Sequence, residues 1–87
     1  MNFGKALELL KTGKSITRNG WNGKGQFVYR MTGQELSTKM KYGYGEYQGE
    51  PRFVDTLVLK NAQNLLVVGW VPSMGDLFAE DWEVVGS

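Results

Sequence analysis

The chain has no cysteine, no histidine and two prolines among its 87 residues. Without cysteine it cannot form the disulfides or thiolate metal sites that stabilise many small secreted domains. Without histidine it lacks the commonest general base and the commonest metal ligand of proteins. Its apolar runs fall well short of the ~18 residues of a membrane span, and residues 1–14 lack the continuous apolar stretch of a signal peptide. We therefore expect a cytosolic protein without a cofactor.

Glycine and aromatic residues are plentiful instead, with 12 glycines, 3 tryptophans, 4 tyrosines and 4 phenylalanines. A chain of this length is expected to fold as one domain, residues 1–87, and to bury about 60% of the surface that its unfolded state exposes. Glycine is entropically costly in so small a fold, so its abundance indicates special backbone shapes. The large rings indicate a core, an interface or a stacking site.

Charge is unevenly distributed along the chain, although the net charge is +1. Residues 1–41 contain eight basic and two acidic residues, a net charge of +6, whereas residues 42–87 contain two basic and seven acidic residues, a net charge of −5. Folding can intermix the two halves and cancel this asymmetry. Alternatively, oppositely charged surfaces of separate protomers can associate, with a basic patch available for an anionic ligand.

The local patterns predict a helix followed by several short strands. Asn2 can cap a helix over Phe3–Lys11, whose apolar residues share one face, and Gly13 supplies a stop. Strands are predicted at residues 15–18, 26–31, 53–59, 65–70 and 82–85. The third and fourth of these are apolar runs that indicate a hairpin of buried strands. The fold class is therefore α+β, a small antiparallel sheet with an amino-terminal helix and a short helix before the last strand.

The middle of the chain, residues 32–52, has little periodicity and is expected to form a long loop or a lid. Within it, Tyr42, Tyr44 and Tyr47 alternate with glycines. Tyrosines in such a segment can stack on the bases of single-stranded nucleic acid. A mobile surface loop, or a lid that becomes ordered with ligand, is the interpretation that we favour.

Residues 18–25 form the most informative segment of the sequence. Its three glycines let backbone amides approach a ligand or adopt left-handed conformations. Arg18 and Lys24 supply positive charge, Asn22 supplies a side-chain amide, and Trp21 offers a plane for stacking. The spacing does not match a Walker-type phosphate loop. The alternative is a glycine-rich hairpin turn whose tryptophan covers the core.

Residues 70–76 form a second group of polar and aromatic side chains. Trp70 ends a strand, and Ser73 and Asp76 have the spacing of a capping box at the start of a short helix. The amides of a helix start favour anions and hydroxyl-rich ligands, and Asp76 suits a ribose hydroxyl or an exocyclic amine. The alternative is that these residues only cap the helix and fill the core. The residues of this helix expected to face inward are Met74, Leu77 and Phe78.

Glu80 and Asp81 form an acidic pair directly before Trp82. Two neighbouring carboxyl groups can perform acid–base chemistry when they are buried. A solvated corner between the short helix and the last strand is the simpler interpretation, and it is the one that we expect.

The two ends of the chain resemble a known family. Residues 2–14, 18–24 and 70–85 are similar to the second type of small Thoeris anti-defence proteins of phages and prophages. The combination of Arg-x-Gly-Trp-Asn-Gly with a later Asp-Leu-x-Ala-x-Asp-Trp carries the resemblance. The similarity covers about residues 1–31 and 53–85.

This resemblance implies a binding protein rather than an enzyme. Members of the family sequester the cyclic ADP-ribose isomer made by the host's TIR-domain defence protein, and some also bind cyclic dinucleotides at a distinct site. They assemble as homotetramers, with pockets between protomers, and act in the host bacterial cytoplasm. The ligand contacts implied by motif position are Trp21 and Trp70 as aromatic platforms, Asn22 and Asp76 as partners of base or ribose, and Arg18, Lys24 and Ser73 as pyrophosphate contacts.

Two other classes of function stay open at this stage. A single-stranded nucleic-acid-binding module would use the three tyrosines and the basic first half, but the acidic second half disfavours it. A structural phage protein would use its aromatic residues as core and interface alone. The lack of histidine and cysteine agrees with binding without turnover.

Overall fold

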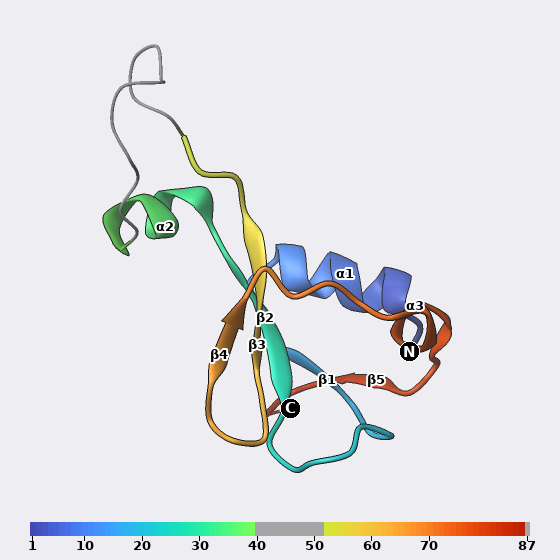
Figure 1. Cartoon of the computed structure of the whole chain (residues 1–87). Coiled ribbons are helices and arrows are strands. Elements are labelled where there is room, and N and C mark those ends of the chain that lie inside the picture. Colours follow the sequence, from blue (N-terminus) through green and yellow to red (C-terminus); the bar gives the residue numbers. More distant parts are fainter. Residues whose placement is uncertain (40–51, 87) are drawn as a thin grey trace.

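A computed structural model describes residues 1–39 and 52–86 of the chain (Figure 1). In chain order the elements are α1 Phe3–Lys11, β1 Ile16–Arg18, β2 Phe27–Met31, α2 Gly33–Lys39, β3 Thr56–Lys60, β4 Leu66–Val68, α3 Met74–Phe78 and β5 Trp82–Val84. The described strands form one antiparallel sheet in the order β4-β3-β2-β1-β5, and α1 packs on one face across β2, β1 and β5. The predicted α+β class is therefore confirmed.

Helix α1 forms as the sequence predicts. The Asn2 side chain accepts a hydrogen bond from the Lys5 amide at 2.9 Å, which satisfies one of the free amides of the first turn. Nine residues are marginal as an isolated helix, so its stability depends on docking. Ala6 and Leu10 are fully buried and provide that docking. The core that they join is completed by Ile16, Val28 and Trp82.

The register of the central strands decides which side chains share a face. Ile16 lies opposite both Val28 of β2 and Val84 of β5, on the face that α1 covers. Because side chains alternate along a strand, Thr17 and its partner Glu83 lie on the opposite face. Arg18 returns to the covered face, opposite Trp82. This register brings a basic side chain beside the buried tryptophan.

A helix replaces the first part of the loop that we expected over residues 32–52. The side chain of Thr32 accepts from the Glu35 amide at 3.2 Å, and a Glu35 carboxylate oxygen accepts from the Thr32 amide at 3.3 Å. This reciprocal pair is a capping box, and its Thr-x-x-Glu spacing is a local sequence signal for the start of α2. Residues 40–51, which include the three tyrosines considered for stacking, lie outside the described residues.

Two predictions of burial were wrong. Strand β4 was expected to be buried, but Leu66, Val67 and Val68 are 60%, 43% and 53% exposed. The apolar residues of α3 were expected to face inward, but they are exposed, whereas Asp76 is buried. The cause is the rotation of α3, since residues two positions before and after Asp76 lie about 200° around a helix of 3.6 residues per turn. The exposed fractions in α3 are 72% for Met74, 45% for Leu77 and 79% for Phe78.

Candidate functional site

Arg18 joins three segments that are distant in the sequence. Its Nε donates to Asp81 Oδ1 at 2.8 Å, and its Nη1 donates to Asp76 Oδ1 at 2.9 Å. Asp81 also accepts from the Gly20 amide at 2.8 Å through its second oxygen. The end of β1, the start of α3 and the residue before β5 are therefore held together by one guanidinium group. Asp81 lies at the predicted corner between α3 and β5, where its side chain is 33% exposed, and its carboxylate also accepts from Arg18 and Gly20.

Asp76 lies at the centre of this network and is 7% exposed. Its Oδ1 accepts from Arg18 and from the Trp21 indole at 3.0 Å, and its Oδ2 accepts from the Ser73 amide at 2.9 Å. The Asp76 amide donates to Ser73 Oγ at 3.1 Å, so the predicted capping box is confirmed. The Trp82 indole donates to the Asp76 carbonyl at 2.9 Å. One residue thus fixes the start of α3 and the orientation of two tryptophans.

The charge balance of the network follows from these contacts. Burial alone would raise the pKa of Asp76, but hydrogen bonds from Ser73, Trp21 and Arg18 outweigh it and lower that pKa below its ordinary value. The hydrogen bond from Arg18, aided by the Gly20 amide, likewise lowers the pKa of Asp81. The two carboxylates raise the pKa of Arg18 further. All three groups are therefore charged at neutral pH.

The three tryptophans meet edge to face beside this network. The ring centroid of Trp21 lies 6.1 Å from that of Trp70 and 5.2 Å from that of Trp82, and the centroids of Trp70 and Trp82 are 6.4 Å apart. The interplanar angles lie between 75° and 80°, an arrangement favoured by the quadrupoles of aromatic rings. Trp82 is 2% exposed, whereas Trp21 and Trp70 are partly buried. The structure therefore brings Trp21 and Trp70 together around a third ring, Trp82, which was predicted only as part of a strand.

The loop after Arg18 borders an open groove of about 430 Å³. This volume lies within the range of ~300–1,000 Å³ typical of small-molecule sites. Asn22 and Lys24 are exposed on the loop, and Gly23 has a φ of +92° that an L side chain rarely adopts. The residues that line the groove are Thr17, Arg18, Asn19, Trp21, Asn22, Gly23, Lys24, Gly25, Gln26 and Glu83.

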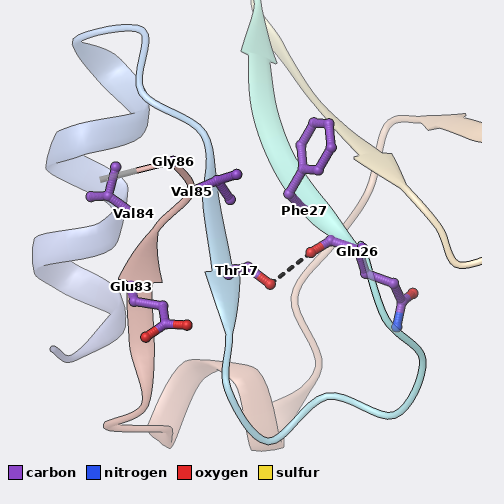
Figure 2. Close-up of a pocket in the computed structure, with 8 residues that line it drawn as sticks. Thr17, Gln26, Phe27, Glu83, Val84, Val85 and Gly86 are labelled. Carbon is purple, nitrogen blue, oxygen red and sulfur yellow. Dashed lines mark hydrogen bonds between the residues drawn. The ribbon is translucent and has the colours of Figure 1, made fainter.

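A second groove, of about 410 Å³, continues along the face of the sheet opposite α1 (Figure 2). It shares Thr17, Gly25, Gln26 and Glu83 with the first groove. Figure 2 shows the Thr17 hydroxyl pointing toward Gln26, whose carbonyl accepts its hydrogen bond at 2.6 Å. The two grooves therefore form adjoining parts of one surface.

The seven predicted contacts fall into two groups. Arg18, Trp21, Asn22 and Lys24 line the first groove. Trp70, Ser73 and Asp76 are not among its lining residues. Asp76 bonds Arg18 and Trp21, Trp70 packs against Trp21, and Ser73 bonds Asp76. Thr17, Gln26 and Glu83 were not predicted as site residues. The pairing of Thr17 with Glu83 across β1 and β5, and the hydrogen bond from Thr17 to the Gln26 carbonyl, place them beside the loop.

Two other kinds of feature are absent from the described residues. In residues 1–39 and 52–86 no helix is long and apolar enough to cross a membrane. In this part of the chain, no group of three or more acidic side chains is arranged to hold a metal ion.

Comparison with known proteins agrees with the sequence motifs. The family model described as the Thoeris anti-defense 2-like domain matches residues 1–85. The chain is also 44% identical over 85 residues to a protein of Bacillus phage SP01 named Thoeris anti-defense 2. That alignment covers 98% of this chain and 94% of the phage protein. It spans the segment at residues 32–52, for which the motifs alone supplied no match.

Proposed function

The chain belongs to the Thoeris anti-defense 2-like family, and on this premise we propose that it blocks Thoeris defence by sequestering a cyclic ADP-ribose isomer in the host bacterial cytoplasm. The ligand is bound and held, not cleaved, so that the defence effector is not activated. Cyclic dinucleotides are a second class of ligand to include in the same measurements. The functional unit is a homo-oligomer, a tetramer by analogy with the family.

The observation that carries this proposal is the groove beside residues 18–26. Four of the seven residues expected from the motifs line it. A doubly negative, adenine-bearing ligand requires a stacking surface, hydrogen-bonding groups and a cation. Trp21, Asn22 and Lys24 supply one of each at the edge of a single groove.

In this proposal the other predicted residues hold the ligand-contacting residues in position. The Arg18 guanidinium already bonds two carboxylates, so we assign it to positioning the loop and Lys24 to the pyrophosphate. Asp76 orients Arg18 and the Trp21 indole, and Ser73 holds Asp76. Trp70 supports Trp21 through their edge-to-face contact. Tight binding follows from such preorganisation, because little side-chain freedom is lost when the ligand enters.

Titration of the purified protein with cyclic ADP-ribose and its isomers, followed by calorimetry, tests this proposal. Lys24→Ala is expected to weaken binding by about tenfold, since a charge-assisted hydrogen bond contributes about 1.5 kcal/mol or more. Lys14→Ala is the matched control, because Lys14 is also an exposed lysine but lies before β1, outside the groove. Equal weakening by both variants would contradict the assignment of the groove.

A nucleic-acid-binding function makes a different prediction in the same assay. Affinity for single-stranded oligonucleotides would fall steeply with salt, with a log–log slope of about −0.7 per neutralised phosphate. The proposed function predicts saturable binding of the cyclic nucleotide and no such oligonucleotide binding.

A further inference from the structure

The free edge of the sheet at β4 is apolar and open to solvent. Leu65 is 61% exposed, and the three residues of β4 that follow are 43–60% exposed. In the described part of the chain, β3 is the strand paired with β4, which leaves the outer edge of β4 without a neighbouring strand. Proteins usually protect such an edge with a charge, a proline or a covering segment, because it is a template for pairing with another strand.

The backbone of β4 is arranged for such pairing. The Leu65 carbonyl accepts from the Asn61 amide, and the Gly69 amide donates to the Leu57 carbonyl, both at 2.9 Å. Backbone groups that face β3 therefore belong to residues 65, 67 and 69, since they alternate along an antiparallel strand. The amide and carbonyl groups of Leu66 and Val68 consequently point toward the open edge.

The opposite edge of the same sheet is protected. At β5, the Trp82 amide donates to the Met1 carbonyl at 3.1 Å, and the Met1 amino group donates to the Trp82 carbonyl at 2.9 Å. Strand β5 also carries the charged Glu83. The edge at β5 is thus blocked by Met1 and a carboxylate, whereas β4 has no charged residue and no covering segment among residues 1–39 and 52–86.

We propose that β4 pairs with β4 of a second copy of this chain, antiparallel and centred on Val67, so that the sheet continues across a twofold axis. Self-pairing is favoured because residues 61–71 contain no charged side chain, so no like charges meet across the seam. In this register Leu66 of one copy lies opposite Val68 of the other. Each such pair exchanges two backbone hydrogen bonds, which gives four across the seam.

The bulge after β4 limits the pairing to this short segment. The amides of Gly69 and Trp70 both donate to the Leu57 carbonyl, and Gly69 has a φ of +85°. Two residues opposite one define a β-bulge, which ends the regular ladder. The seam therefore extends over residues 65–69 and cannot slide further along the chain. This inference names an interface of the oligomer that the proposed function calls for, but its test needs no ligand.

Single-cysteine variants test the interface cleanly, because the natural chain has no cysteine. In the proposed register the two Val67 residues form a non-hydrogen-bonded pair with Cα atoms about 4.5 Å apart, within the ~4.4–6.8 Å of disulfides. Val67→Cys is therefore expected to give a disulfide-linked dimer under mild oxidation in dilute solution. Val68→Cys is the matched control, because its two copies are diagonal neighbours about 7–8 Å apart. A dimer with Val68→Cys, or none with Val67→Cys, would overturn the proposal.

A second variant measures the interface without a cross-link. Val67→Lys places two like charges at the centre of the seam and is expected to lower the mass measured by light scattering by at least twofold. Val54→Lys is the control for surface charge, because Val54 is 82% exposed and lies outside β4. Far-ultraviolet circular dichroism verifies that both variants are folded. An unchanged mass for folded Val67→Lys would contradict pairing through β4.

Discussion

At the scale of single residues, Asp76 connects the helix start, the arginine and the tryptophans. It accepts hydrogen bonds from three different groups while it is 7% exposed. A buried carboxylate would be costly without such partners, so the network must form together with the fold. Asp76, which the sequence motif suggests as a ligand contact, therefore also stabilises the fold through its hydrogen bonds.

Asp76→Ala is expected to lower the free energy of unfolding by about 2–3 kcal/mol, because it removes hydrogen bonds to a charged group. Urea denaturation followed by circular dichroism measures this loss. Asp76→Asn should lose less, since an amide oxygen can still accept from Trp21. Glu80→Ala is the control on an exposed carboxylate, with an expected change within about 0.5 kcal/mol. A similar loss for Asp76→Ala and Glu80→Ala would contradict the central role of Asp76.

Acid should weaken the fold through the same network. The pKa values of Asp76 and Asp81 are lowered in the folded state, whereas an unfolded aspartate titrates near ~3.9. The unfolded chain therefore binds more protons in this range, so their stabilisation is complete above about pH 4 and is lost as the pH falls through the lower folded values. The melting temperature should fall as the pH is lowered below about 4, and less steeply in Asp76→Asn. If the melting temperatures of the natural protein and of Asp76→Asn fell in parallel with pH, the assigned role of Asp76 would be contradicted.

At the scale of elements, the start of α2 lies so close to the backbone of Phe53 that Gly33 has no room for a side chain. A Cβ at Gly33 would lie 1.9 Å from the Phe53 carbonyl oxygen. The Gly33 amide also donates to Asp55 Oδ1 at 2.9 Å. Helix α2 therefore begins against the segment that leads into β3, and this approach requires glycine.

Gly33→Ala is expected to destabilise the protein by about 1–3 kcal/mol, as overpacking does. Gly75→Ala in α3 is the matched control, because its Cβ would meet Ser73 Oγ at an ordinary 3.7 Å. Replacing a helical glycine with alanine at such a site is expected to stabilise the fold by about 0.4–1 kcal/mol. Chemical denaturation compares the two variants. A loss of stability in Gly33→Ala together with a gain in Gly75→Ala supports the close backbone contact at Gly33, and equal changes in stability would contradict it.

The elements predicted correctly from sequence are those with local signals. The Asn2 cap, the apolar face of α1 and the capping box of Ser73 with Asp76 all depend on residues within four positions of one another. The burial predicted for the apolar residues of α3 was wrong. The helix turns Asp76 inward instead, because Asp76 bonds Arg18, which is 58 residues away in the sequence. Four of the seven residues named from the motifs line the groove, but which of the seven would do so could not be predicted, because it depends on how distant segments pack in the fold. Helix α2 was predictable in principle from Thr32 and Glu35.

At the scale of the whole molecule, folding mixes part of the charge asymmetry of the chain. Arg18 pairs with Asp76 and Asp81, and Arg30 lies 3.6 Å from Asp55, so these ion pairs join the basic first half to the acidic second half. Lys24 is an exposed basic residue at the groove. For these two arginines, folding therefore intermixes the basic and the acidic half of the chain. Lys24 is the cation that our proposal assigns to the ligand.

The central claim is that the protein holds a cyclic ADP-ribose isomer without converting it. The most direct measurement is to incubate protein and ligand, remove free ligand by desalting, denature the protein by heat, and analyse the released nucleotide by chromatography. The account predicts recovery of the intact cyclic compound in stoichiometric proportion to the binding sites. Recovery of a linear hydrolysis product, or of no nucleotide at all, would contradict it.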